Sequence, residues 1–259
     1  MNLGAFIKIS IITVVRNGDA TIAQCMDSVL SQTTQPFEYL IIDGKSTDRT
    51  LEVIDENSWP TVKVISEPDQ GLYDAMNKGI NLSSGNVIGL INADDVYADI
   101  HVLHRVSDFF SAHPEIDACY GDLCYVKCDD LSRIVRYWQS NSYQQGLFKK
   151  GWVPPHPTLF VRKEVYIKHG GFDLSYRIAA DFELMLRFIA TNHIRTAYIP
   201  YIMVKMRLGG TTNRSIKNIL LQNIEIRRAL RSHNMSSSLV GFIAHKGWSR
   251  FLQFIQRPQ

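Results

Sequence analysis

The sequence predicts an α/β fold with a mainly parallel central sheet flanked by helices. Apolar, β-branched runs alternate with segments of helical periodicity at intervals of roughly 20–30 residues, a pattern typical of successive βαβ units. Three of the predicted strands end in polar turns that carry Asp. Because ligands bind in open α/β sheets at the carboxyl ends of the strands, these turns predict one shared cleft.

The first half of the chain contains four predicted strands and three predicted helices. Residues 7–15 are rich in β-branched side chains and form the first strand. The other strands are 39–42, 62–65 and a run that begins at Val87 and ends at Asp94-Asp95. The predicted helices are 21–33, a segment that begins at 46–48, and 72–82.

The second half is less regular. Residues 152–157 are predicted to be non-helical, because each proline there disfavours helix at the preceding residue. The remaining expectations are helices at 100–113, 163–169, 182–190 and 216–231, strands at 118–122, 134–138, 158–161 and 198–206, and a loop at 144–151. The chain is expected to end in a basic, helical extension over residues 211–259.

The strand that begins at Val87 stops in two adjacent carboxylates, Asp94 and Asp95. Neighbouring acids repel each other unless a cation or a proton shares the site. An oxygen-only ligand set suits Mg²⁺ or Mn²⁺, which commonly bridge protein carboxylates to substrate phosphates. An Asp-rich turn or helix cap explains the same two residues, and both interpretations stand at this level.

Charge is unevenly distributed along the chain. Residues 205–259 contain ten Lys or Arg residues and one acid, Glu225, whereas residues 1–204 contain 18 basic and 24 acidic residues. This distribution argues against a general nucleic-acid binder and indicates an anionic partner for the tail. The spacing of the four cysteines favours reduced thiols over a zinc site. Without a signal-peptide pattern or a bilayer-length apolar stretch, the protein is expected in the cytoplasm.

Seven segments carry motifs that point to one family: 10–13 with Asn17, 42–48, 71–79, 91–95, 156–160, 170–173 and 180–184. Together they resemble the family 2 glycosyltransferases, which are inverting enzymes with the GT-A fold, a Rossmann-like architecture. The similarity is closest to bacterial transferases that build exopolysaccharide, O-antigen or glycolipid sugars, and it extends to about residue 210.

The resemblance implies an organisation and a set of site residues. Residues 1–210 would form the GT-A domain, with a nucleotide-sugar-binding half at 1–97, an acceptor-binding half at 98–210 and the extension at 211–259. Asp94 would bind the metal with Asp95 beside it, and Asp181 would be the general base. The residues expected to bind the nucleotide-sugar are Thr13, Asn17, Asp43, Asp69, Asn92 and Asp94.

The chain departs from the family pattern at three positions. Asn92 stands where the first Asp of the Asp-x-Asp signature is usual, Gly44 replaces the second Asp of an Asp-Asp-Gly-Ser turn, and Met76 replaces a common Arg. Lys78 is a candidate substitute for that Arg in contacting the diphosphate, against the alternative of an exposed helix lysine.

Two further side chains are candidates for contacts with the diphosphate or the acceptor. His156 lies between prolines, where a rigid structural loop is the favoured explanation. Trp152 is a candidate to stack on a sugar ring.

The implied reaction moves a sugar from a UDP-, GDP- or dTDP-linked donor to a hydroxyl of a lipid-linked or oligosaccharide acceptor, with Mn²⁺ or Mg²⁺ as cofactor. A sugar nucleotidyltransferase and a catalytically inactive nucleotide-sugar-binding module are the alternatives. Residues 238–256 are amphipathic and basic, which predicts either peripheral contact with an anionic membrane or packing on the domain. The helix at 216–231 presents either a solvated face or a homodimer surface.

Overall fold

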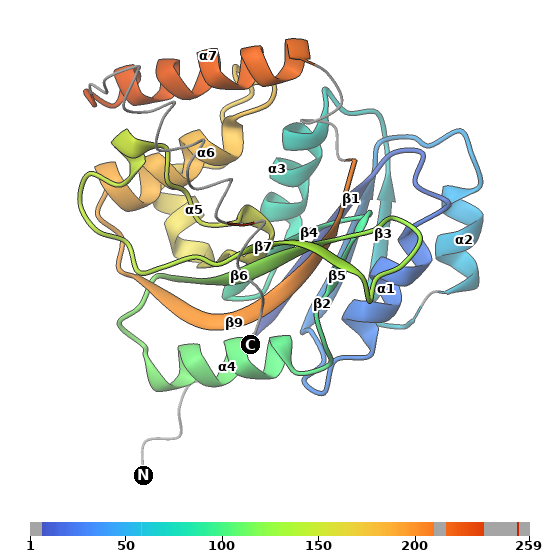
Figure 1. Ribbon diagram of the computed structural model, residues 1–259. Helices are drawn as coiled ribbons and strands as arrows, with labels where there is room; N and C mark the ends of the chain where they lie inside the picture. Colours follow the sequence, from blue (N-terminus) through green and yellow to red (C-terminus); the bar gives the residue numbers. More distant parts are fainter. Residues whose placement is uncertain (1–6, 58, 210–215, 236–252, 254–259) are drawn as a thin grey trace.

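A computed structural model describes residues 7–57, 59–209, 216–235 and 253 of the chain and shows a central sheet with helices on both faces (Figure 1). The described strands form one nine-stranded sheet in the order β3-β2-β1-β4-β8-β6-β9-β5, with β7 paired to β6. The α/β, Rossmann-like architecture predicted from the sequence is confirmed.

The first half of the sheet is entirely parallel. Strands β3, β2, β1 and β4 lie side by side with their carboxyl ends at one edge. The elements are β1 (Ile9–Val15), α1 (Ile22–Leu30), β2 (Glu38–Asp43), α2 (Thr50–Glu56), β3 (Val62–Ser66), α3 (Leu72–Leu82) and β4 (Val87–Asn92). All seven match the predicted segments to within a few residues, because their periodicity is strong.

The second half of the sheet is mixed. Strand β8 pairs antiparallel with both β4 and β6, and β6 pairs parallel with β9. The elements are β5 (Asp95–Tyr97), α4 (Val102–Ala112), β6 (Ala118–Val126), β7 (Ile134–Trp138), the 3₁₀ turns η1 (Phe148–Lys150) and η2 (His156–Thr158), β8 (Phe160–Arg162), α5 (Lys163–His169), α6 (Ala180–Met185), the π-helical η3 (Leu186–Thr191), β9 (Thr196–Arg207) and α7 (Ile216–Ser232).

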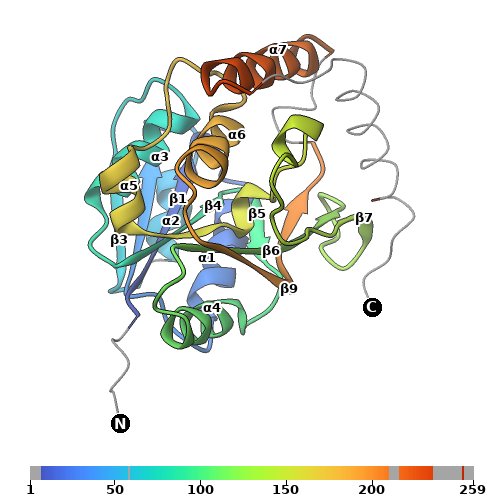
Figure 2. The ribbon, with the colours of Figure 1, turned by 90° about the vertical axis from the view of Figure 1, so that its left-hand side faces the viewer.

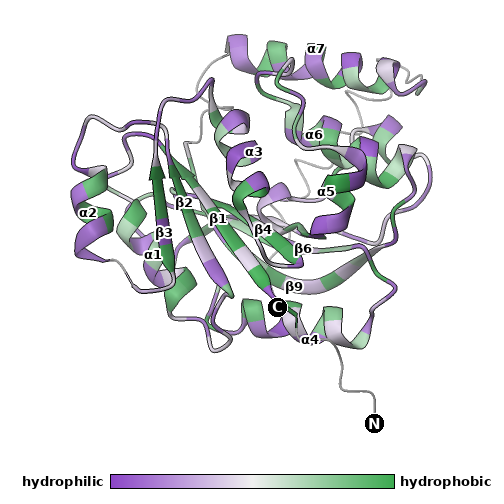
Figure 3. Cartoon of the chain, turned by 180° about the vertical axis from the view of Figure 1, so that it is seen from behind, coloured by the Kyte–Doolittle hydropathy of each residue, from purple (hydrophilic) through white to green (hydrophobic). Residues whose placement is uncertain are grey.

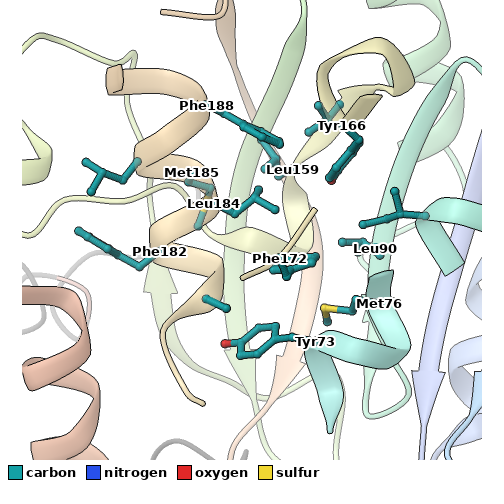
Figure 4. Close-up of a cluster of buried hydrophobic side chains, with 14 of the residues drawn as sticks. Tyr73, Met76, Leu90, Leu159, Tyr166, Phe172, Phe182, Leu184, Met185 and Phe188 are labelled. Atoms are coloured by element: carbon teal, nitrogen blue, oxygen red, sulfur yellow. The ribbon is translucent and has the colours of Figure 1, made fainter. Parts of the chain in front are cut away.

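Two cores lie on opposite faces of the sheet, because successive strand side chains alternate between the faces. In β1, Ile12 and Val14 pack with α3, α5 and α6, whereas Ile9 and Ile11 pack with α1 and α4. The turned view separates these two helical layers (Figure 2), and the strands are largely hydrophobic along their length (Figure 3). Figure 4 shows the first core, in which Tyr73 of α3 stacks on Phe172 and Tyr166 of α5 packs edge-on to Phe188 of η3.

Two predictions for the second half need correction. Residues 156–158 form a single 3₁₀ turn, which is possible because Pro157 lies in the first turn, where its missing N–H costs no hydrogen bond. The predicted helix at 182–190 begins earlier, at Ala180, and continues as a π-helix from Leu186. The amphipathic stretch 238–256 lies outside the described residues except for Gln253. No helix in the described ranges is long and apolar enough to cross a bilayer.

Candidate active site

The carboxyl ends of β1, β2 and β4 converge because the three strands are paired in parallel. Val15 lies beside Asp43, and Val14 lies beside Asn92. The loops that follow these strands therefore start from neighbouring positions on one edge of the sheet. This edge carries most of the donor-site residues that were predicted from the sequence.

Asn17 joins the first two of these loops. Its backbone has a left-handed φ of 54°, a conformation that Asn tolerates better than most residues. Its Oδ1 accepts a hydrogen bond from the backbone N–H of Thr47 at 2.9 Å, and its own N–H donates to Ser46 Oγ at 2.8 Å. Asn17 is exposed at this junction and holds the two loops together.

Asp43 closes the loop after β2. Its carboxylate is fully buried and accepts hydrogen bonds from the N–H and hydroxyl of Ser46 and from the hydroxyl of Ser66 at 2.6 Å. A nucleotide would therefore contact this carboxylate only by displacing one of the two serine hydroxyls.

Gly44 leaves room for Asp69. A Cβ at position 44 would overlap the Oδ2 atom of Asp69, whose Oδ1 accepts a hydrogen bond from the Gly71 N–H at 2.9 Å. The departure of Gly44 from the family pattern thus has a local cause, since Asp69 from the β3–α3 connection occupies the space. A second Asp at position 44 would also place two like charges in contact.

Thr13 needs correction as a direct nucleotide contact. Its side chain has no exposed surface and points away from the cleft, toward Cys25 of α1. The Thr13 hydroxyl hydrogen-bonds with the hydroxyl of Tyr39 at 2.9 Å. Because Ile11 and Val15 face the same core, strand alternation places Thr13 in that core as well.

The two carboxylates after β4 occupy different environments. Asp94 is half-buried, whereas Asp95 opens strand β5 with 1% of its surface exposed. Asn92 donates a hydrogen bond from its amide to Asp95 at 3.0 Å. Burial, reinforced by the charge of Asp94, raises the pKa of Asp95 well above its usual value. A proton or a cation at this pair would relieve the repulsion between the two acids.

The site fits a divalent cation that substrate oxygens help to hold. Among the residues that the structure describes, no three His, Cys, Asp or Glu side chains gather into a metal cluster. The buried Oδ1 atoms of Asn92 and Asp95 accept no hydrogen bond within the described chain, and both residues lie within two positions of Asp94 in sequence. One or two carboxylates completed by phosphate oxygens are the usual coordination of Mg²⁺.

Asp181 lies at the start of α6 with its carboxylate partly exposed. Its Oδ1 accepts a hydrogen bond from the Phe182 N–H at 2.8 Å and lies 3.3 Å from the Tyr73 hydroxyl. Burial, followed by the charge of Asp181, raises the pKa of Tyr73 well above its usual value, so the phenol remains a donor. The same hydroxyl donates to the carbonyl oxygen of Ile178 at 2.8 Å.

His156 brings the two halves of the site together. Its Nδ1 atom lies 3.4 Å from Asp181 Oδ2, and 26% of its side chain is exposed. Burial lowers the pKa of His156 below its ordinary value, while the negative charges of Asp181 and Asp94 oppose this shift. The lowered pKa favours the neutral form of the imidazole.

An apolar cavity lies beside these groups. His156 and Asp181 line it together with Leu90, Leu159, Tyr166, Phe172, Leu184 and Met185, most of which appear in Figure 4. The carboxylate of Asp181 therefore has an apolar side formed by the core and an exposed side toward solvent.

The structure gives Lys78 and Trp152 local partners. Lys78 Nζ lies 2.9 Å from Glu67 and donates to the carbonyl oxygen of Pro68 at 2.7 Å, so its charge is already engaged. These contacts favour a structural role over a contact with the diphosphate. Trp152 donates from its indole N–H to Asn141 at 2.8 Å and packs edge-on to Phe148. It is half-buried.

Two residues at the site were not recognised from the sequence. Tyr73 lies inside the Gly71–Gly79 motif but carried no assigned role, although an aromatic hydroxyl in that motif was an available signal. Arg207, at the end of β9, donates to the carbonyl oxygen of Asp94 and to Gln24. No local pattern marks Arg207, because its partners lie more than 100 residues earlier in the chain.

Comparison with known sequences identifies related proteins. The family model described as "Glycosyl transferase family 2" matches residues 10–170. Over 225 residues the chain is 29% identical to a PGL/p-HBAD biosynthesis glycosyltransferase of Mycobacterium bovis, with 85% of each chain covered. It is also 36% identical over 200 residues to the chondroitin synthase of Pasteurella multocida, covering 76% of this chain but 20% of that protein.

Solved structures share the fold at low sequence identity. The structure of S. aureus TarS 1–349 in complex with UDP-GlcNAc superposes with a TM-score of 0.67 at 15% identity, covering 92% of this chain and 72% of that one. The mannosyltransferase PcManGT from Pyrobaculum calidifontis, in complex with GDP-Man and Mn²⁺, gives a TM-score of 0.62 at 15% identity, covering 94% and 83%. Both likenesses concern the arrangement of the elements.

Proposed function

The chain belongs to glycosyltransferase family 2, and from this premise we propose that it transfers a sugar from a nucleotide-sugar to a hydroxyl of a lipid-linked or oligosaccharide acceptor, with inversion. One observation carries the proposal. His156 lies 3.4 Å from Asp181 of α6, and both residues line one cavity with Leu90 of β4, the strand that ends just before Asp94. Asp94, which would bind the metal of the donor complex, and Asp181, which would activate the acceptor hydroxyl, thus flank one site.

The donor would bind along the edge of the parallel strands. Asn17, Asp43, Asp69 and Asn92 lie in or beside the loops there. Asp94, together with the Oδ1 atoms of Asn92 and Asp95, would hold a divalent cation. A bound Mn²⁺ or Mg²⁺ would neutralise the negative charge that grows on the departing diphosphate. In GT-A relatives, the complex of PcManGT with GDP-Man and Mn²⁺ supports such a cofactor.

Asp181 would act as the general base. A sugar hydroxyl is a poor nucleophile until a positioned carboxylate accepts its proton as the new glycosidic bond forms. The Phe182 N–H orients Oδ1, which also lies 3.3 Å from the Tyr73 hydroxyl. The other oxygen, Oδ2, lies 3.4 Å from His156 Nδ1 and would accept the proton of the incoming hydroxyl. In an inverting displacement the base lies opposite the leaving group. The placement of Asp94 and Asp181 in different halves supports that geometry.

Two relatives support the proposed acceptor class. Similarity to a glycosyltransferase of PGL/p-HBAD biosynthesis supports a glycolipid acceptor, and similarity to chondroitin synthase supports an oligosaccharide. Residues 1–97 would form the donor half and residues 98–210 the acceptor half, with Trp152 in contact with the acceptor sugar. The cytoplasmic location, the membrane contact through 238–256 and the homodimer remain predictions.

A donor screen with single variants tests the proposal. Release of nucleoside diphosphate from UDP-, GDP- and dTDP-sugars is measured with Mn²⁺, with Mg²⁺ and with chelator, and the anomer of the product is assigned by NMR. Asp181→Asn is expected to lower kcat by about 10²- to 10⁴-fold with unchanged donor affinity. Asp94→Ala is expected to abolish the metal-dependent rise in thermal stability with donor.

Asp108→Asn is the matched control, because this acid is 68% exposed on α4, on the opposite face of the sheet. Normal turnover by Asp181→Asn would contradict its role as base. Donor binding without any diphosphate release by the wild type would support the inactive binding module. Release of inorganic pyrophosphate from a nucleoside triphosphate and a sugar phosphate would support the nucleotidyltransferase.

A further inference from the structure

Glu225 is the single acid among residues 205–259, and it is buried. It lies on α7 with 5% of its surface exposed, whereas the charged residues around it on that helix are arginines. Its two carboxylate oxygens accept hydrogen bonds at 2.9 Å from three successive backbone N–H groups, those of Arg177, Ile178 and Ala179. A buried acid is thus fully paired with backbone donors.

These three N–H groups belong to the segment that leads into α6. The first N–H groups of a helix have no partner within it, and α6 has no capping side chain of its own at Ala179. Glu225 supplies acceptors immediately before this helix, from an element about 45 residues later in the chain. A negative carboxylate also interacts favourably with the positive end of a helix dipole.

The peptide group between Ile178 and Ala179 is held from both sides. Its N–H, on Ala179, donates to Glu225 on α7, and its carbonyl oxygen, on Ile178, accepts from the Tyr73 hydroxyl on α3. Asp181 follows three residues later. The segment that leads to Asp181 is therefore held between α3 and α7.

Helix α7 is fixed where it meets this segment. Ile226, Ala229 and Leu230 are buried in the core that also contains α6. Arg228 donates to Ser175, two residues before the segment. Figures 1 and 2 both place α7 directly over α6. The family-model match ends at residue 170, so neither helix lies within the matched region.

We propose that Glu225 is a positioning residue for catalysis: through the N–H groups of residues 177–179, α7 fixes the orientation in which Asp181 meets the acceptor hydroxyl. This inference rests on the proposed function for the role of Asp181. The first helix of the basic extension is thereby part of the catalytic architecture. A displacement of about 1 Å by a distant change costs on the order of 10²-fold in rate.

Turnover measurements separate positioning from folding. Glu225→Ala is expected to lower kcat by about 10²-fold per folded molecule, while the donor Kd from calorimetry stays within about twofold. Glu225→Gln keeps one acceptor oxygen and is expected to retain more of the wild-type kcat than Glu225→Ala. Arg231→Gln, an exposed change on the same helix, is the control and is expected to keep both values. If the kcat of Glu225→Ala, expressed per donor-binding site, stayed within twofold of the wild type, the inference would be overturned.

A double-mutant cycle with Tyr73→Phe covers the case in which Glu225→Ala does not fold. Because both side chains hold one peptide, the effects of Glu225→Gln and Tyr73→Phe on kcat are expected to be non-additive. Additive effects would contradict the shared clamp.

Hydrogen exchange makes the test independent of activity. The amides of residues 177–179 are expected to lose protection in Glu225→Gln and to keep it in Arg231→Gln. Unchanged protection would refute the clamp even if the proposed reaction were wrong. A wild type without transferase activity, but with these amides protected by Glu225, would refute the proposed function alone.

Discussion

Replacing Glu38 with Gln is expected to destabilise the fold strongly without impairing the site. Glu38 opens β2 at the edge of the sheet opposite to Asp43, and 3% of its surface is exposed. Burial would raise the pKa of Glu38, but hydrogen bonds outweigh it and lower the pKa to about 2. The donors are the Ser10 hydroxyl at 2.6 Å, the N–H and hydroxyl of Ser84, and Lys63 at 3.2 Å.

The magnitude follows from this pKa. Relative to the ordinary value of 4.5, a folded pKa of about 2 corresponds to about 3 kcal/mol of stability at pH 7, treated as an upper bound. Because the folded pKa is depressed, this contribution is present above pH 4.5 and is lost as the pH falls through about 2. At pH 3 less than half of it remains, about 1.4 kcal/mol.

Urea unfolding of the wild type and Glu38→Gln at pH 7, 5 and 3 measures the effect. The difference in the free energy of unfolding is expected to be about 2–3 kcal/mol at pH 7 and to shrink toward pH 3, with kcat per folded molecule unchanged. Glu52→Gln is the matched control, since Glu52 pairs with Arg49 but is 67% exposed and is expected to matter little. A difference under about 1 kcal/mol at pH 7, or one independent of pH, would refute this account.

Three further substitutions test the packing around the site. Gly44→Ala is expected to displace Asp69 and weaken donor binding by about tenfold in calorimetry, because the new Cβ would overlap that carboxylate; unchanged affinity would contradict the contact. Gly89→Ala places a Cβ 2.5 Å from the Phe160 ring, and it is expected to cost about 1–3 kcal/mol in urea unfolding while donor affinity is kept. Lys78→Met is expected to leave donor affinity within about twofold, because the amine already pairs with Glu67. A larger loss of affinity in the same titration would support a contact between Lys78 and the diphosphate.

Much of the fold was predictable because its signals are local. The β-branched run of β1 and the helical periodicity of α1 and α3 are properties of short segments, and all three elements lie where the sequence predicts them. The polar ends of parallel strands predict a shared edge, since parallel pairing brings those ends together. The mixed pairing of β8, β6 and β9 was not predicted, because strand order and direction depend on contacts between distant segments.

The sequence by itself determined the parallel half of the sheet, the family and the acids that end its strands. Only the tertiary structure decided what those groups touch. It turned Thr13 into the core, placed Asp69 over Gly44 and brought His156 beside Asp181. It also set Glu225 against the segment before α6. The physical reason is distance along the chain. Periodicity shows which face of an element is apolar, whereas the hydrogen bonds of Thr13 with Tyr39 and of Glu225 with Ile178, 26 and 47 positions apart, depend on packing that no short segment of sequence contains.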